Sequence, residues 1–183
     1  MQREVIETIA AHSGPDDRFL GLLFSGLGTG KTSLALGVAG YLYARHRSVG
    51  KDGFVDNVLF VVPTAPVLYD VVAMLWRAGV NCSIVARDSK IRGNYKAYDA
   101  KKDSPCHIFL TDFHVARMVL DTQLRARLGL HYSSENLNIS MMIIDEPTIG
   151  ADTPGSIYTR LFVDIMALAP AKTILMSGTM PRY

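Results

Sequence analysis

The stretch SGLGTGKT, residues 25–32, directly follows the apolar run LGLLF at 20–24 and decides the fold. Glycines let a backbone turn tightly and approach a ligand closely, at a cost in chain entropy. A helix that begins after such a turn presents unsatisfied N–H groups, which favour bound anions. The stretch therefore predicts a strand, a phosphate-binding loop and a helix, in that order.

The pattern matches G-x-x-x-x-G-K-[ST] except that Ser25 stands at the first position. In this pattern Gly28 and Gly30 take conformations that a Cβ would obstruct, while Lys31 reaches the β and γ phosphates and the Thr32 hydroxyl ligates Mg²⁺. The predicted nucleotide-binding residues are Ser25, Gly26, Gly28, Thr29, Gly30, Lys31 and Thr32. The alternative is a glycine-rich turn without a ligand.

Composition limits the classes that the chain can belong to. With 183 residues, 49% hydrophobic and 20% charged, it fits one globular domain, 1–183. A net charge of +2 excludes a global basic excess, so any nucleic acid must meet a local patch. Cys82 and Cys106 lack metal-ligand spacing and are expected to be buried thiols. No signal peptide or membrane-spanning run is found, so we expect a soluble, intracellular protein without a membrane partner.

Short apolar runs alternate with segments of helical length. The expected strands are 20–25, 57–62, 82–86, 107–111, 140–145 and 172–177, and the expected helices are 3–11, 32–45, 66–78, 112–128 and 156–169. Runs with little alternation are typical of strands covered on both faces. The order predicts a three-layer α/β sandwich with a mostly parallel, doubly wound sheet.

The segment 87–105 is long and basic, and it is expected to be a loop. It carries Lys90, Arg92, Lys96, Lys101 and Lys102 together with two tyrosines. Charge-rich segments are usually solvated surface. A nucleic-acid contact is the alternative, because basic side chains neutralise phosphates.

A second motif, MMIIDEPT at 141–148, is an apolar strand that ends in two carboxylates. A strand end of this form delivers one acidic side chain to Mg²⁺ and a second to the attacking water. Asp145 is the predicted magnesium ligand, and Glu146 is the predicted general base. A solvated acidic pair is the alternative.

In these motifs the chain resembles the first RecA-like domain of helicase superfamily 2, over nearly its whole length. Residues 25–32 are similar to motif I, 62–65 to motif Ia, 110–112 to the Ib region, 145–148 to the DEAD or DEAH box, and 177–179 to the Ser-Ala-Thr of motif III. The resemblance implies a RecA-like P-loop ATPase with ATP and Mg²⁺ as cofactors, acting on single-stranded RNA or DNA. Lys31, Asp145 and Glu146 would then be the catalytic residues.

The resemblance also implies roles outside the nucleotide site. Pro63, Thr64, Thr111 and Arg117 are candidates for contacts to a nucleic-acid backbone, and Ser177 and Thr179 would couple nucleotide state to strand grip. Gln2 is the candidate for reading adenine. The alternatives are a helix cap for Thr64 and a solvated helix face for Arg117.

Two departures from the family limit these implications. Thr148 stands where the box has Asp or His, so neither named subgroup is assigned. The chain ends at Tyr183, just past the motif III region, so we expect the second RecA-like domain and its arginine fingers to be absent. Since an arginine finger contributes about 10³–10⁵ in rate, the isolated domain is expected to be weakly active or inactive until joined to that partner domain.

Two other functions compete with a helicase or translocase. The stretch DEPTIGAD at 145–152 also resembles the Walker B and D-loop of ABC-type ATPases. That family needs a Leu-Ser-Gly-Gly-Gln signature shortly before the box, where this chain has LHYSSENLNIS. The other candidate is a nucleotide-dependent binding module without turnover.

Overall fold

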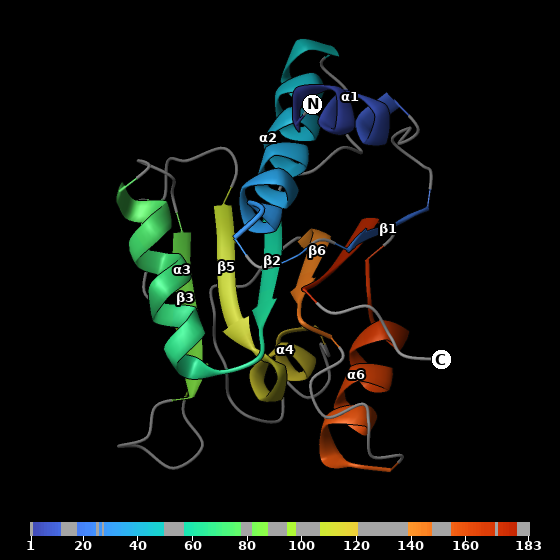
Figure 1. The fold of residues 1–183 in the computed structure, drawn as a ribbon. Coiled ribbons are helices and arrows are strands. Elements are labelled where there is room, and N and C mark those ends of the chain that lie inside the picture. The colour runs from blue at the N-terminus through green and yellow to red at the C-terminus, as the bar shows by residue number, and fades with distance from the viewer. Residues whose placement is uncertain are drawn as a thin grey trace.

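The computed structural model describes residues 2–11, 18–24, 26, 28–49, 57–77, 82–87, 95–97, 107–120, 139–147, 155–170 and 172–178 (Figure 1). Its helices are α1 Gln2–Ala11, α2 Lys31–Val49, α3 Ala65–Arg77, α4 Phe113–Leu120 and α6 Ile157–Ala167. Its strands are β1 Phe19–Phe24, β2 Asn57–Val62, β3 Cys82–Arg87, β4 Tyr95–Ala97, β5 His107–Asp112, β6 Ile139–Asp145 and β7 Lys172–Ser177.

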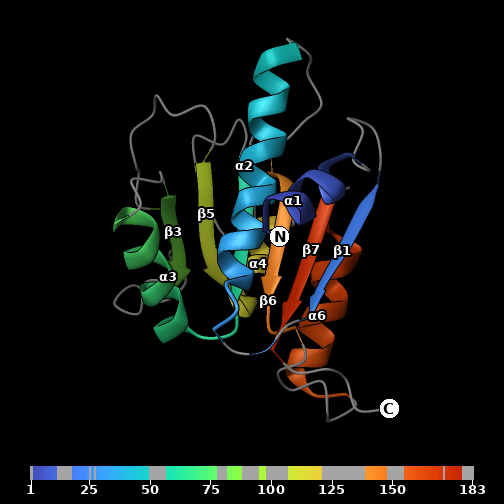
Figure 2. The ribbon, with the colours of Figure 1, turned by 45° about the horizontal axis from the view of Figure 1, so that its top comes forward.

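The strands form one sheet in the order β1-β7-β6-β2-β5-β3-β4. All neighbours pair in parallel except β3 and β4, which are antiparallel. The predicted mostly parallel sheet is therefore confirmed. The arrowheads of the parallel strands point to the same edge (Figure 2), here called the carboxyl edge. Every loop that follows a parallel strand begins there.

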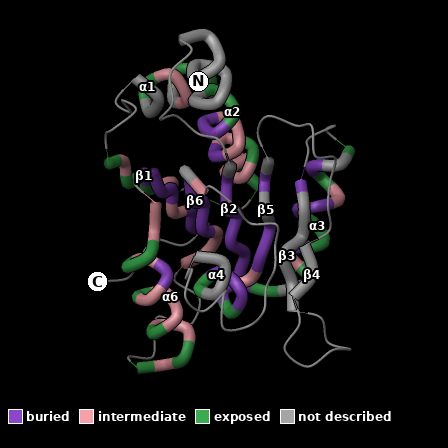
Figure 3. The backbone as a smooth tube through the Cα atoms, turned by 180° about the vertical axis from the view of Figure 1, so that it is seen from behind, coloured by how far each residue is buried: buried purple, intermediate pink, exposed green. Residues whose placement is uncertain are grey.

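Helices cover both faces of the sheet, which gives the predicted three layers. Helices α2 and α3 pack on one face with α1 against α2, and α4 and α6 pack on the other (Figures 1 and 3). Strand β2 shows why this arrangement is stable, since all five residues from Val58 to Val62 are fully buried. A strand that is apolar on both sides can only lie between two layers.

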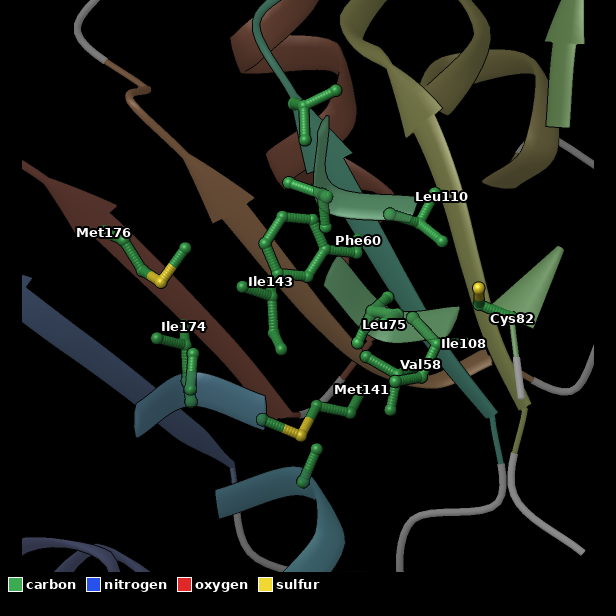
Figure 4. Packing of buried hydrophobic residues seen from close by; sticks show 14 of the residues in the cluster. Val58, Phe60, Leu75, Cys82, Ile108, Leu110, Met141, Ile143, Ile174 and Met176 are labelled. Atoms are coloured by element: carbon green, nitrogen blue, oxygen red, sulfur yellow. The ribbon is translucent and has the colours of Figure 1, made fainter. Parts of the chain in front are cut away.

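Alternate residues of the central strands face opposite cores. Val58, Phe60, Met141, Ile143 and Ile174 join the core under α2 and α3 (Figure 4), together with the buried thiol of Cys82. Leu59, Val61, Met142 and Ile144 join the core under α4 and α6. The predicted burial of Cys82 is confirmed, whereas Cys106 lies outside the described residues.

Most element ends differ from the sequence-based boundaries by a few residues, and two of these differences need a physical explanation. The segment expected to be a loop contains β4, which pairs Tyr95 with Arg87 and extends the sheet by one antiparallel edge strand. Of the helix expected at 112–128, Phe113–Leu120 is confirmed and residues 121–128 lie outside the described part of the chain, whereas Asp112 is the last residue of β5. Its Oδ1 accepts a hydrogen bond from the Val115 N–H at 3.0 Å, so this residue caps the helix and does not begin it.

None of the described helices is both long and apolar enough to cross a membrane.

Helix α1 approaches α2 closely at a glycine. A Cβ added to Gly37 would lie 2.6 Å from Cδ1 of Ile6, whereas one added to Gly40 would meet nothing within 4 Å. Beside this contact lies a largely open cavity of about 650 Å³ lined by Arg3, Ile6, Glu7, Gly37 and Tyr41. Glycine at position 37 therefore allows α1 to pack against the middle of α2.

We expect Gly40→Ala to stabilise the protein by about 0.5–1 kcal/mol, because alanine is the better helix former and has room there. The Gly37→Ala variant should be less stable than the Gly40→Ala variant by about 1 kcal/mol, because the Cβ added at position 37 must displace Ile6. Urea unfolding of the two variants measures both free energies. Equal gains at the two positions would contradict the close packing of α1 on α2.

Candidate nucleotide site

The glycine-rich loop has the backbone that its sequence predicts. Gly28 and Gly30 have φ values of 75° and 81°, in the left-handed region that side chains disfavour. The hydroxyl of Thr29 donates to the carbonyl of Gly26 at 2.8 Å, and Nζ of Lys31 donates to the same carbonyl at 3.0 Å. Two side chains of the loop therefore converge on one of its own carbonyls.

Helix α2 starts directly from this loop. The Leu34 N–H donates to the Gly30 carbonyl at 2.9 Å. Gly30 is therefore the residue immediately before the helix, and its carbonyl accepts this hydrogen bond of the first turn. The N–H groups of the first turn have no partner within a helix and point toward the loop. The positive end of the α2 dipole and the Lys31 charge thus lie at the same place.

Gly28 and Gly26 allow a matched test of the loop. A Cβ at either position would meet nothing within 4 Å, but of these two only Gly28 has positive φ. We expect Gly28→Ala to destabilise the protein by about 1–2 kcal/mol through backbone strain alone, and Gly26→Ala to be nearly neutral. Chemical unfolding of both variants measures the difference. Equal effects would mean that the loop relaxes without cost.

Asp145 ends β6 at the carboxyl edge and is half-buried. Burial raises the pKa of its carboxyl, and the negative charge of Glu146 raises this pKa further. The positive charge of Lys31 and a backbone hydrogen bond at Glu146 act in the opposite direction. Lys31 therefore lies close enough to Asp145 for the two charges to interact, although they come from different strand ends.

The sheet explains why Lys31 and Asp145 lie at the same part of the carboxyl edge. Strand β7 lies between β1 and β6, and it pairs Phe24 with Ser177 and Asp145 with Met176. With neighbouring strands about 4.8 Å apart, the ends of β1 and β6 are separated by about 10 Å. The glycine-rich loop and the acidic strand end therefore share one part of the carboxyl edge.

Glu146 has an unusual conformation that β7 holds in place. Its φ of 46° is the only positive value among the described residues other than glycine. Its N–H donates to the Met176 carbonyl at 2.8 Å, its Oε2 accepts from the Ser177 hydroxyl at 2.9 Å, and its Oε1 accepts from the Gly178 N–H at 2.6 Å. A side chain at positive φ costs on the order of 1–3 kcal/mol, which these hydrogen bonds offset.

These contacts were only partly foreseeable from the sequence. Ser177 was a candidate through its likeness to motif III, and the structure places its hydroxyl on Glu146. The Gly178 amide and the Met176 carbonyl are backbone groups that no sequence motif names. The small residues at 177–178, directly after an apolar strand, were the one available signal.

Three candidate residues lie wholly or partly outside the described part of the chain. Ser25 and Thr179 are not described, and Gln2 begins α1 without a described side chain. The next residue, Arg3, pairs with Glu7 at 2.8 Å and lies near Tyr41. Tyr41 is ten residues along α2 from Lys31, or about 15 Å. The adenine role of Gln2 stays a prediction.

The candidate nucleic-acid residues share the carboxyl edge but differ in access. Pro63 is buried, and Thr111 is fully buried with an Oγ1 that lacks a hydrogen-bond partner. In this conformation neither side chain can reach a bound strand. Thr64 and Arg117 are exposed, and the Thr64 carbonyl accepts from the Leu68 N–H at 3.1 Å, in the first turn of α3.

Arg117 forms an ion pair across the helical layer. Its Nε lies 3.2 Å from Oδ2 of Asp164, which joins α4 to α6. One turn earlier, the His114 ring meets the Tyr158 ring edge-on at 5.7 Å. The solvated face predicted for α4 is exposed at both positions, but it also contacts α6. A role for Arg117 in strand binding remains a prediction.

No family model and no curated protein matches the chain. Among solved structures, it is similar to a nuclease-deletion mutant of the Type ISP restriction-modification enzyme LlaGI in complex with a DNA substrate mimic, with a TM-score of 0.61 and 17% identity. The match covers 100% of this chain and 17% of that enzyme's chain, so this chain spans about a sixth of its length. At this identity the likeness is one of fold, and it agrees with the predicted RecA-like α/β architecture.

Proposed function

We propose that this chain is the ATP-binding domain of a nucleic-acid-dependent motor of the superfamily 2 type, which hydrolyses ATP when joined to a second RecA-like domain. One observation carries the proposal: a glycine-rich loop with Lys31 and a strand end with Asp145 and Glu146 meet at one part of the carboxyl edge. Ligands of open α/β sheets bind at this edge.

The residues at this edge fit a magnesium-bound triphosphate. Gly28 and Gly30 already have the backbone that a phosphate-binding loop requires, and the start of α2 supplies N–H donors and a positive dipole. Lys31 now donates to a carbonyl of its own loop, which a phosphate oxygen would replace as the acceptor. Thr32 and Asp145 would hold Mg²⁺ together with phosphate oxygens and water, the usual composition of such a site.

Asp145 is suited to a cation for an electrostatic reason. Burial and Glu146 raise the pKa of this carboxyl, so its negative charge is disfavoured in the absence of a counter-charge. A divalent cation beside it would reverse that penalty. When bound, Mg²⁺ would neutralise negative charge on the terminal phosphates.

Glu146 is the general base in this proposal. It would accept a proton from the water whose oxygen bonds to the γ-phosphorus, while the bond from that phosphorus to the bridging oxygen breaks and ADP leaves. Arginine fingers of a second domain would stabilise the charge on the transferred group. Without them, the chain should bind ATP and turn it over slowly.

The nucleic acid is proposed from two lines of support. The similar enzyme is described in complex with a DNA substrate mimic. In this chain Thr64 is exposed at the start of α3, at the same edge as the glycine-rich loop, where a strand backbone could be held without reading its sequence. A protein distinguishes RNA from DNA by contacts to the 2′-hydroxyl of the ribose, so such a contact would set the preference of this site.

Binding and turnover together test the proposal. Titration with a fluorescent ATP analogue should give saturable binding that requires Mg²⁺. Phosphate release should be slow, and single-stranded DNA or RNA should accelerate it once a second RecA-like domain is joined to the chain. Absence of Mg²⁺-dependent binding would overturn the proposal. Binding without any turnover in the joined protein would favour the binding module, and turnover that nucleic acid leaves unchanged would favour the ABC-type ATPase.

A further inference from the structure

We propose that Ser177 and the Gly178 amide hold Glu146 in a resting position, so that the end of β7 restrains hydrolysis until nucleotide binding releases the carboxylate. This inference rests on the proposed function and names the regulation of the same site. Ser177 acts as a positioning residue, because its hydroxyl donates to Glu146, the proposed general base.

The first support is that both carboxylate oxygens of Glu146 are engaged at once. The Ser177 hydroxyl donates to Oε2 and the Gly178 N–H donates to Oε1, at 2.9 Å and 2.6 Å. Two donors from adjacent residues fix the plane of the carboxylate against the end of β7. To turn toward a water at the glycine-rich loop, the side chain would have to give up one or both of these hydrogen bonds.

The second support is the backbone of Glu146. A φ of 46° is disfavoured for a side chain, and the Met176 carbonyl helps to maintain it by accepting from the Glu146 N–H. All three partners belong to one short segment, 176–178, which follows Glu146 by about 30 residues in the sequence. A displacement of that segment would therefore loosen all three contacts together.

The third support is the position of Ser177 in the sheet. It is the register partner of Phe24, the last residue of β1 before the glycine-rich loop. Ser177 is 1% exposed, so solvent does not compete for its hydroxyl. A ligand bound at the glycine-rich loop after Phe24 would lie next to the strand end that holds Glu146, because β1 and β7 are neighbours in the sheet.

The same contacts could instead orient Glu146 for catalysis, and the two interpretations predict opposite signs. If Ser177 restrains Glu146, Ser177→Ala should raise turnover at low ATP concentration by about tenfold, the value of one hydrogen bond to a charged group, because nucleotide binding no longer has to break this contact; turnover at saturating ATP should not fall. Thr173→Val is the matched control, because Thr173 lies on the same strand and donates to the Pro170 carbonyl, remote from Glu146. A fall in turnover for Ser177→Ala would overturn the proposal.

Amide hydrogen exchange at Gly178 tests the same inference without turnover. In the nucleotide-free chain, Glu146→Ala should accelerate exchange of this amide by about tenfold, and the control Glu4→Ala should not. In the unmodified chain, saturation with Mg²⁺ and a non-hydrolysable ATP analogue should produce a similar acceleration. Unchanged protection at saturation would overturn the release of Glu146.

These outcomes separate the inference from the proposed function. If the analogue fails to bind in a titration, the proposed function is wrong. Amide exchange in the nucleotide-free chain still shows whether the Gly178 N–H is hydrogen-bonded to Glu146, because that measurement needs no ligand.

Discussion

Lys31→Ala should abolish measurable ATP binding, with a loss of affinity of about 100-fold or more. The side chain would supply charged hydrogen bonds to the phosphates, each worth about 1.5–3 kcal/mol, and about 1.4 kcal/mol corresponds to tenfold. No other described side chain of the glycine-rich loop carries a positive charge. Titration with a fluorescent ATP analogue in the presence of Mg²⁺ measures the loss.

The structure supplies a second reason to expect a large effect from Lys31→Ala. Lys31 is the positive charge that counteracts the raised pKa of Asp145. Removing it leaves Asp145 and Glu146 as an uncompensated acidic pair, which would repel the phosphates as well as fail to attract them. The loss in ATP affinity caused by Lys31→Ala should therefore depend less on ionic strength than the loss caused by removing an exposed surface lysine. The reason is that Asp145 and Glu146 are partly buried.

The control for Lys31→Ala is Arg77→Ala. Arg77 is exposed in the last turn of α3, on a different helix from the glycine-rich loop. Both variants should keep the thermal stability of the parent chain within a few degrees. Unchanged ATP affinity in Lys31→Ala, in a chain that remains folded, would contradict the nucleotide site itself.

Strand positions were predictable where burial alone determines them. Strand β2 occupies exactly the residues expected, 57–62, because a short apolar run bounded by polar segments can satisfy its backbone only inside a sheet. The side chains of β2 alternate between the core under α2 and α3 and the core under α4 and α6, as expected because successive residues of a strand point to opposite faces of the sheet. The same reasoning placed Asp145 at the end of β6.

Features that depend on distant residues were not predictable. Strand β4 is only three residues long and includes Lys96, so its sequence carries no strand signal, and its pairing with β3 provides the structure. Glutamate has no preference for positive φ, so the conformation of Glu146 could not be read from its neighbours. It follows from partners at 176–178, which only the folded sheet brings to it.

Access at the carboxyl edge was equally hidden from the sequence. Thr111 and Thr64 both come near the end of an apolar run, and the sequence treats them alike as candidates for contact with a nucleic-acid strand. In the fold Thr111 lies in register with Val61 inside the sheet, whereas Thr64 lies beyond the end of β2. Thr111 is the fifth of the six residues of β5, whereas Thr64 lies two residues past the end of β2, and this position relative to the strand end decides which hydroxyl is exposed.

Glu146→Gln should retain ATP binding and lower turnover by about 10²–10⁴-fold in the protein joined to its second RecA-like domain. The amide has the size of the carboxylate but cannot accept a proton from water, and this range is the usual contribution of a general base. Affinity should stay within a few-fold of the parent, because Lys31, Thr32 and Asp145 are unchanged. Single-turnover phosphate release separates the two quantities.

Glu146→Gln also alters the contact with β7, so its interpretation needs a control of the same chemistry. The glutamine oxygen can still accept from the Ser177 hydroxyl, but its NH₂ group cannot accept from the Gly178 N–H, which loses its partner. Ser177→Ala weakens the same contact and leaves the carboxylate in place. If Ser177→Ala speeds turnover while Glu146→Gln stops it, then the turnover lost in Glu146→Gln is caused by the missing proton transfer and not by the weakened contact with the end of β7. Normal turnover in Glu146→Gln would mean that another residue activates the water.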